Sequence, residues 1–393
     1  MHKSGPYALR ATVKGFQVKA AILEAPATDL IVEHIDCQEP HAGEVLVRIA
    51  ASGVCQSDLH VVHGTQTNPL PVVLGHEGAG IVEAVGPNVT RVRAGDHVVL
   101  SWVPYCGQCV YCLSGHPNLC QVAYAALSKG TMLDGTSRLS WSGRRGDGLP
   151  SPVYHYSFIS SFAEYAVVPE SGCVVIGPDI PLDKAALVGC AVMTGVGAAL
   201  NTAHVQPGST VAVIGAGGVG LNVMQGAQLA GAISIIAIDI NPSKLARAHT
   251  FGATHVINAA ETDAVATVRE LTKGVGADFS FEAVGRPETM RQCWEMAHPG
   301  GTVVMVGIAP QGSELSLPAN RIVREERRLV GSFYGSARPH IDMPLILELY
   351  MAGKLKLDEL ATHHFSLEQI NEAVHSLESG EAIRPVIVYD NRR

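Results

Sequence analysis

The stretch that decides the fold is Val211-Ala-Val-Ile214, followed directly by Gly215-Ala-Gly217-Gly218-Val219-Gly220. The first four residues form a β-branched run of the kind found in buried strands. The glycines permit a tight turn and let a following helix pack closely on the strand. The first turn of that helix offers unpaired N–H groups and partial positive charge, which suit a pyrophosphate. The stretch therefore predicts a strand, turn and helix that bind a dinucleotide.

An acid in the right place sharpens this prediction. Asp239 closes the next β-branched run, 19 residues beyond Gly220. There a carboxylate can accept hydrogen bonds from the adenosine ribose 2′-OH, and it would repel a 2′-phosphate. The competing interpretation is that Asp239 only caps a turn before Pro242. Because strand, helix and acid follow in register, we expect the cofactor to be NAD.

The flanking sequence predicts an α/β protein. From about residue 191, β-branched runs (211–214, 235–238, 255–257, 279–281, 303–306) alternate with helical segments (219–229, 242–250, 288–296). This alternation is typical of a doubly wound parallel sheet. From residue 19 to about 189, short apolar runs are broken by Gly, Pro and Asp, which predicts a mostly β domain. Near the C-terminus we expect helices at 344–352 and 367–379 and a strand at 384–388, and residues 129–152 read as a surface loop.

Composition limits the class of protein. A chain of 393 residues suits two domains, and its net charge of −8 gives no general attraction to nucleic acid or to an anionic membrane. The apolar stretch 185–200 is shorter than the roughly 20 residues of a bilayer helix, and the stretch 211–238 is interrupted by glycines, so we expect no membrane span. We find no signal peptide. The nine cysteines therefore favour metal binding over disulfides, and we expect the protein to lie in a reducing cytoplasm.

Four cysteines lie in one short lobe, with two, two and seven residues between them: Cys106, Cys109, Cys112 and Cys120. Four thiolates can close a tetrahedral shell around Zn²⁺ with no open position, which is typical of a structural site. An iron–sulfur cluster is the alternative, but the ferredoxin run has three residues and then Cys-Pro before its last ligand. Four unrelated buried cysteines at this density would be unusual. The spacing favours a structural zinc.

A second candidate set is dispersed along the chain and consists of Cys55, His76 and Cys190. Two thiolates and one imidazole leave a fourth zinc position for water or substrate, as in catalytic zinc sites. A lone buried cysteine or histidine is more often structural, and composition alone leaves this alternative open.

These residues and their neighbours carry a resemblance. The run from Gly53 to His60, the run from Gly75 to Gly78, the four-cysteine lobe, the run from Gly189 to Gly195 and the glycine-rich turn follow in one order. The chain thereby resembles the zinc-containing alcohol dehydrogenases of the medium-chain dehydrogenase/reductase family, from about residue 19 to residue 389. The resemblance implies a GroES-like catalytic domain (1–190 and 344–393, with the zinc lobe at about 104–122) and an inserted NAD-binding Rossmann domain (191–343).

The resemblance also implies roles for single residues. Cys55, His76 and Cys190 would bind the catalytic zinc, so that the chain would hold two Zn²⁺ in all. Asp58 would orient His76, and Glu77 would lie behind the metal and bind it transiently. Ser57 and His60 would form a proton relay. The cofactor-binding residues would be Gln56, Thr194, Gly215, Gly217, Gly218, Val219, Gly220, Asp239, Lys244 and Arg384, with Arg384 as a phosphate contact.

Four positions differ from relatives or bear on the substrate. Gln56 stands where many relatives carry a cation against the pyrophosphate. Tyr124 stands where the glutathione-dependent formaldehyde branch carries an arginine, and Gln66 occupies the position of a nearby acid in that branch. Trp102 falls at an aromatic wall of the substrate pocket; its alternative is a core or interface tryptophan.

We therefore expect an NAD-dependent zinc enzyme that converts primary alcohols, aliphatic or aromatic, reversibly to aldehydes. The alternatives are a dehydrogenase for formaldehyde–thiol adducts and a non-catalytic binding protein on the same fold. Residues 129–152 resemble the corresponding segment of dimeric members, which favours a dimer.

Overall fold

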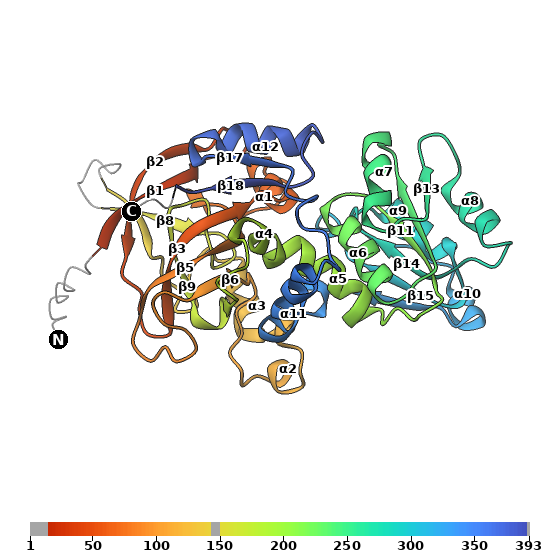
Figure 1. Ribbon diagram of the computed structural model, residues 1–393, viewed down its shortest axis with the longest axis horizontal. Coiled ribbons are helices and arrows are strands. Elements are labelled where there is room, and N and C mark those ends of the chain that lie inside the picture. The colour runs from red at the N-terminus through yellow and green to blue at the C-terminus, as the bar shows by residue number, and fades with distance from the viewer. Residues whose placement is uncertain (1–14, 143–149, 391–393) are drawn as a thin grey trace, which may run out of the picture.

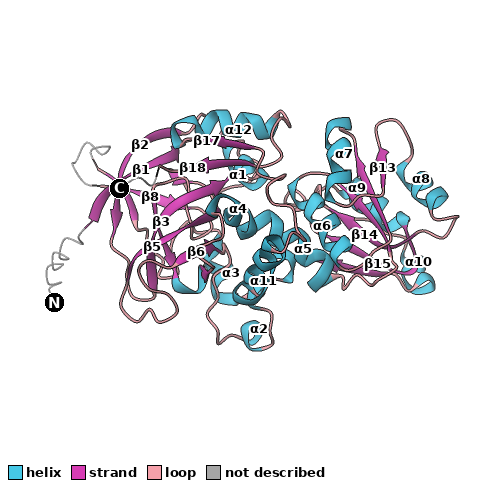
Figure 2. Ribbon diagram, viewed as in Figure 1, coloured by secondary structure: helices cyan, strands magenta, loops and turns pink. Residues whose placement is uncertain are grey.

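The computed structural model describes residues 15–142 and 150–390, which form two lobes side by side (Figures 1 and 2). One lobe is mostly β and contains both ends of the described chain. The other consists of a twisted sheet with helices on its faces. The predicted α/β class, with a GroES-like domain and a Rossmann domain, is confirmed by this architecture.

The β lobe contains a small closed barrel and a seven-stranded sheet. The barrel has the order β1-β2-β7-β8-β4, and the sheet has the order β10-β6-β5-β3-β18-β17 with β9 also paired to β3. The strands are β1 (Gly15–Leu23), β2 (Ile31–Gln38), β3 (Glu44–Gly53), β4 (Val72–Val73), β5 (Glu77–Val85), β6 (His97–Leu100), β7 (Leu139–Trp141), β8 (Ser151–His155), β9 (Tyr165–Pro169), β10 (Cys173–Val175), β17 (His363–Phe365) and β18 (Pro385–Val388). Since β18 pairs with β3, the chain returns to its first lobe near the C-terminus.

The second lobe is a six-stranded parallel sheet in the order β13-β12-β11-β14-β15-β16. Its strands are β11 (Thr210–Ile214), β12 (Ser234–Asp239), β13 (His255–Asn258), β14 (Ala277–Glu282), β15 (Ala297–Met305) and β16 (Arg328–Gly331). Its helices are α6 (Gly218–Leu229), α7 (Pro242–Ala248), η5 (His249–Phe251), α8 (Ala264–Leu271), α9 (Pro287–Met296) and α10 (Ala319–Glu325). The strand order reverses between β11 and β14, and ligands of such sheets bind at that switch point, beyond the carboxyl ends of the strands.

A long apolar helical run joins the two lobes. It consists of α4 (Leu182–Leu187), the π-helix η3 (Val188–Val192), α5 (Met193–Gly197) and the π-helix η4 (Ala198–Thr202). Its length and hydropathy match those of a membrane span, but 78% of its most apolar window is buried inside the protein. Burial of this kind is typical of the central helix of a globular core, and the residues pack in the cluster that both lobes share.

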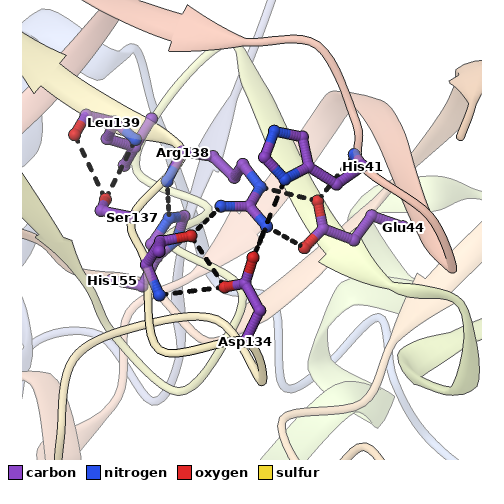
Figure 3. A network of polar contacts seen from close by, with 8 residues as sticks. His41, Glu44, Asp134, Ser137, Arg138, Leu139 and His155 are labelled. Atoms are coloured by element: carbon purple, nitrogen blue, oxygen red, sulfur yellow. Dashed lines mark hydrogen bonds and ion pairs between the residues drawn. The ribbon is translucent and has the colours of Figure 1, made fainter. Parts of the chain in front are cut away.

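The segment 129–152, predicted as a surface loop, has loop structure at 129–138, but the prediction is wrong at 139–141 and 151–152. It contributes β7 and the start of β8 to the barrel, and Met132 and Arg138 are buried. Figure 3 shows the cause: Arg138 donates to both carboxylate oxygens of Glu44, at 2.8 and 2.7 Å, and to Asp134 at 2.6 Å. A buried arginine with two acidic partners satisfies its donors, so a Gly- and Ser-rich segment can enter the core. Residues 143–149 of the predicted loop lie outside the described residues.

The remaining helices are short, apart from two near the C-terminus. The short ones are α1 (Gln56–Val62), α2 (Val110–Leu113), η1 (Pro117–Leu119), α3 (Gln121–Leu127), η2 (Glu170–Gly172), η6 (Tyr334–Ser336) and η7 (Leu367–Gln369). The other two are α11 (Pro339–Met351) and α12 (Ile370–Glu378). Helix α11 begins five residues before the predicted 344, because Pro339 suits the first turn and Pro344 is accommodated inside the helix. We retain the domain boundaries at 190 and 344 as a proposal.

Candidate active site

Four side chains from distant parts of the chain converge between the lobes. Cys55 lies at the N-cap of α1, directly after β3, and His76 and Glu77 lie at the start of β5. Cys190 lies in the π-helical turn of the joining helix. One ligand atom from each of the four lies within 4.8 Å of the others, and all four residues are buried. Two thiols and an imidazole so close together fit the donor set of a catalytic zinc site.

Asp58 organises the first two predicted ligands. Its Oδ1 lies 3.2 Å from His76 Nδ1, and its Oδ2 accepts a hydrogen bond from the Cys55 amide at 2.9 Å. Asp58 is fully buried. Burial lowers the pKa of His76, but Asp58 and the Cys55 thiol together raise that pKa well above its ordinary value. A carboxylate on one ring nitrogen is the usual outer partner of a metal-binding histidine, and it leaves the other ring nitrogen, Nε2, for a metal.

Glu77 and Arg384 form a buried ion pair behind this set. Arg384 Nη2 contacts Glu77 Oε2, and both side chains are at most 4% exposed. Burial raises the pKa of Glu77 to about 7, against the opposing effect of Arg384. Glu77 Oε1 also accepts a hydrogen bond from the Ala191 amide at 3.1 Å. The predicted phosphate contact Arg384 thus lies against the metal set. It also lies against the glycine-rich turn, since a Cβ on Gly218 would come within 2.9 Å of its Cδ.

The predicted proton relay starts beside Cys55. Ser57 Oγ lies 3.9 Å from Cys55 Sγ. His60 is exposed, and its Nδ1 lies 3.0 Å from Thr65 Oγ1. Sequence reasoning missed Tyr156, whose hydroxyl donates to the Ser57 carbonyl at 3.1 Å and whose ring meets the His76 ring edge-on at 5.4 Å. No local pattern marks this tyrosine, because its contacts are made across the fold.

The glycine-rich turn has the predicted geometry. Gly215 has a φ of 99°, and a Cβ on Gly220 would lie 1.7 Å from the Gly215 carbonyl oxygen, so neither position admits a side chain. Helix α6 starts at Gly218 with Gly217 as its N-cap. Asp239 Oδ2 accepts a hydrogen bond from the Ala216 amide at 2.8 Å, so the acid lies beside the turn.

The other predicted cofactor residues differ in their exposure and in the elements that carry them. Thr194 lies on α5, which packs on α6 so closely that a Cβ on Gly195 would be 2.4 Å from the Val219 carbonyl oxygen. Lys244, on α7, is half-buried, and Gln56 is exposed at the start of α1. The roles of these residues toward a cofactor stay predictions.

The four-cysteine lobe forms a second, separate set. Its ligand atoms also lie within 4.8 Å of one another, and all four cysteines are free thiols. Backbone amides point at the sulfurs: Cys109 N donates to Cys106 Sγ at 3.4 Å and Cys106 N to Cys120 Sγ at 3.3 Å. Backbone hydrogen bonds lower the pKa of Cys109 to about 6. By contrast, burial raises the pKa of Cys112 to about 12. The closed group of four free thiols is what fits a structural zinc.

Trp102 lies between this lobe and the joining helix. Its ring is 4.6 Å from that of Tyr334 and 5.3 Å from that of Phe333. With Phe158 and Phe333 it borders a cavity of about 10 Å³, room for about one water, beside Tyr124, which is 70% exposed. Trp102 Nε1 is buried and has no hydrogen-bond partner among the described residues. Whether Trp102 contacts substrate stays a prediction.

Comparison with known proteins finds a matching family for each of the two lobes. Residues 41–178 match the family "Alcohol dehydrogenase GroES-like domain", and residues 218–350 match "Zinc-binding dehydrogenase". The chain is 41% identical to an alcohol dehydrogenase class-3 of Cereibacter sphaeroides over 95% of this chain and 100% of that one. It is equally identical, with the same coverage, to an S-(hydroxymethyl)glutathione dehydrogenase of Paracoccus denitrificans. The crystal structure of benzyl alcohol dehydrogenase from Acinetobacter calcoaceticus has a TM-score of 0.89 at 34% identity, covering 95% of this chain and 99% of that one.

Proposed function

Because the chain belongs to the zinc-containing alcohol dehydrogenase family, with zinc and NAD as its cofactors, we propose that it oxidises primary alcohols, aliphatic or aromatic, reversibly to aldehydes. The observation that carries the proposal is the convergence of Cys55, His76 and Cys190 beside the glycine-rich turn. Three metal ligands that leave a fourth position for substrate, next to a dinucleotide site, suit metal-assisted hydride transfer from an alcohol.

The protein's own groups divide the work. When bound, zinc supplies Lewis-acid polarisation of the alcohol oxygen and NAD supplies the hydride acceptor. Ser57, beside Cys55, accepts the alcohol proton. His60, which is exposed, exchanges that proton with solvent. Asp58 keeps His76 Nδ1 occupied, so that only Nε2 is free to bind a metal.

Dehydrogenation of a formaldehyde–thiol adduct is the second candidate, and the relatives' names favour it. One of the two relatives compared above is named S-(hydroxymethyl)glutathione dehydrogenase. In this chain an exposed tyrosine, Tyr124, stands where the resemblance places the arginine of the glutathione-dependent branch. Loss of that charge weighs against glutathione, but it does not weigh against a smaller or uncharged thiol.

One panel of substrates tests both candidates. Initial rates are measured with NAD and NADP on ethanol, octanol and benzyl alcohol, and on formaldehyde mixed with glutathione or with cysteine. We expect turnover of free alcohols with NAD. Activity confined to a thiol adduct would contradict the first candidate in favour of the second. No turnover on any substrate by protein that holds two zinc ions per chain would favour a binding protein.

We also propose that the enzyme is a cytoplasmic homodimer without nucleic-acid or membrane partners. Support comes from the resemblance of residues 129–152 to the dimeric members and from the net charge of −8. Light scattering after size-exclusion chromatography measures the mass in solution; a monomer or a tetramer would contradict the dimer.

A further inference from the structure

The turn that carries Cys190 is held from both sides. On one side, the Ala191 amide donates to Glu77 Oε1 at 3.1 Å. On the other side, the hydroxyl of Tyr334 donates to the Gly189 carbonyl. The residues immediately before and after Cys190 are thus each fixed by one side chain. The turn is also π-helical. This geometry is rare in proteins overall, and where it occurs it is often at a functional site.

Tyr334 reaches this turn from the other lobe. It follows β16, the last strand of the parallel sheet, and it is 2% exposed. Tyr334, Gly335 and Ser336 have φ values of 57°, 64° and 50°. Tyr334 and Ser336, on either side of Gly335, are non-glycine residues in the left-handed region. This conformation costs free energy, so the surroundings must hold it.

The surroundings do so through several contacts. Asn201 Nδ2 donates to the Gly335 carbonyl at 3.3 Å, and Thr202 Oγ1 lies 2.8 Å from Ser336 Oγ. Gly335 packs so tightly on α5 that a Cβ there would be 2.4 Å from the Met193 carbonyl oxygen. The backbone is therefore clamped in the conformation that points the Tyr334 ring at Gly189.

The four-cysteine lobe holds the same segment from outside. Asn118 precedes the last lobe cysteine by two residues and is 4% exposed. Its Nδ2 donates to the Phe333 carbonyl at 2.9 Å. The Trp102 ring covers the Tyr334 ring at 4.6 Å. A continuous series of contacts thus runs from the lobe through Phe333 and Tyr334 to the residue before Cys190.

We infer that Tyr334 is a positioning residue for Cys190, and that Asn118 ties this support to the four-cysteine lobe. The inference rests on the proposed assignment of Cys190 as a catalytic metal ligand. A ligand whose two neighbours are fixed loses little freedom when the metal binds. Loss of one supporting bond should therefore loosen the metal at this site and leave the lobe metal in place.

Tyr334→Phe tests this, because it keeps the ring against Trp102 and removes only the hydroxyl. We measure release of zinc to a chelating dye, and the visible spectrum after Co²⁺ replaces the catalytic metal. Outer partners of ligands contribute about 10- to 100-fold to metal affinity. We expect one zinc per chain to leave about tenfold faster, the second at the wild-type rate, and the cobalt bands to shift.

Tyr350→Phe is the control, since that hydroxyl bonds only the exposed Asp358, at 3.2 Å, among the contacts described. Unchanged release and an unchanged cobalt spectrum in folded Tyr334→Phe would overturn the inference. If that variant does not fold, Asn118→Ala is tested instead. It should also speed the release of one zinc per chain, but by less than Tyr334→Phe. Cys190→Ser checks the premise: retention of both zinc ions there would refute the ligand assignment, independently of Tyr334.

Discussion

At the scale of single residues, Asp239 is expected to decide between NAD and NADP. Its carboxylate is fixed by the Ala216 amide at 2.8 Å and the Asn241 amide at 2.9 Å. It therefore holds the turn, and it also presents a fixed negative charge where a 2′-phosphate would lie. Asp239→Ser should raise kcat/KM with NADP about tenfold, equivalent to about 1.4 kcal/mol, and should lower it with NAD.

Steady-state rates with both cofactors measure this effect. Asp263→Ser is the matched control, because Asp263 caps helix α8 through the Val265 and Ala266 amides and serine also caps well. That variant should keep the wild-type cofactor preference. A wild-type enzyme with equal kcat/KM for NAD and NADP would contradict the role given to Asp239.

Residues in motifs that the family resemblance covers could be predicted, and residues outside such motifs could not. Cys55, His76 and Cys190 were predicted as one set, and their side chains converge. Tyr156 and Tyr334 were missed, although Tyr156 contacts His76 and Tyr334 contacts the residue before Cys190. Their hydroxyls reach backbone carbonyls 99 and 145 residues away, and nothing local to a tyrosine predicts such a partner.

At the scale of elements, long periodic segments were predicted better than short ones. Strands β11 to β14 and the helix after the glycine-rich turn lie within two residues of their predicted bounds, because a buried β-branched run has few alternatives. Strand β15 begins six residues before its predicted start, and β16 was not predicted. Strand β7 has three residues, too few to display a period. The π-helical turn at Cys190 depends on tertiary contacts, which the sequence of the helix does not reveal.

A contact between barrel strand β8 and Arg138 gives a prediction about pH. His155 is buried, and its Nε2 accepts a hydrogen bond from the Arg138 amide at 3.1 Å (Figure 3). Burial, helped by Arg138, lowers the pKa of His155 to about 3. Below its ordinary pKa of about 6.5, the unfolded chain therefore binds a proton that the folded protein refuses. The free energy of unfolding should therefore decrease as the pH is lowered. At pH 5 this histidine alone should account for a loss of about 2 kcal/mol.

Urea unfolding of His155→Gln at pH 7.5 and pH 5 measures this contribution. The variant should be less stable than wild type at pH 7.5 but should lose less stability on acidification. His41→Gln is the control, since His41 lies on the same network, 3.7 Å from Asp134, and is 41% exposed. An equal loss of stability in His155→Gln and wild type would contradict the buried neutral histidine.

The four-cysteine lobe gives a second prediction at this scale. A closed structural zinc contributes directly to folding, whereas an open catalytic zinc contributes mainly to turnover. Cys112→Ser should therefore lower Tm, while the molecules that remain folded should keep their turnover. Cys190→Ser should abolish turnover and change Tm less. Differential scanning calorimetry and initial rates on both variants make the comparison. The reverse pattern would mean that the two sites have been assigned the wrong way round.

At the scale of the whole molecule, three distant parts of the chain meet at Arg384. It precedes β18, pairs with Glu77 at the start of β5, and lies against Gly218 at the start of α6. One guanidinium thus touches both the metal set and the cofactor turn. Arg384→Gln would leave the Glu77 carboxylate buried without its partner, and breaking a buried pair in this way costs about 3–5 kcal/mol. We expect a large fall in Tm and weaker NADH binding.

A second substitution separates these two effects. Glu77→Gln in the Arg384→Gln background removes the unpaired carboxylate, so most of the lost stability should return. If Arg384 also contacts the pyrophosphate, the charge-assisted bonds stay lost, and NADH should still bind about tenfold more weakly than to wild type. Thermal unfolding gives the stability, and titration of NADH fluorescence gives Kd, with zinc content measured on each protein. Recovery of Kd together with Tm would mean that Arg384 serves Glu77 alone. The helix terminus at Gly218 would then hold the phosphates without this arginine.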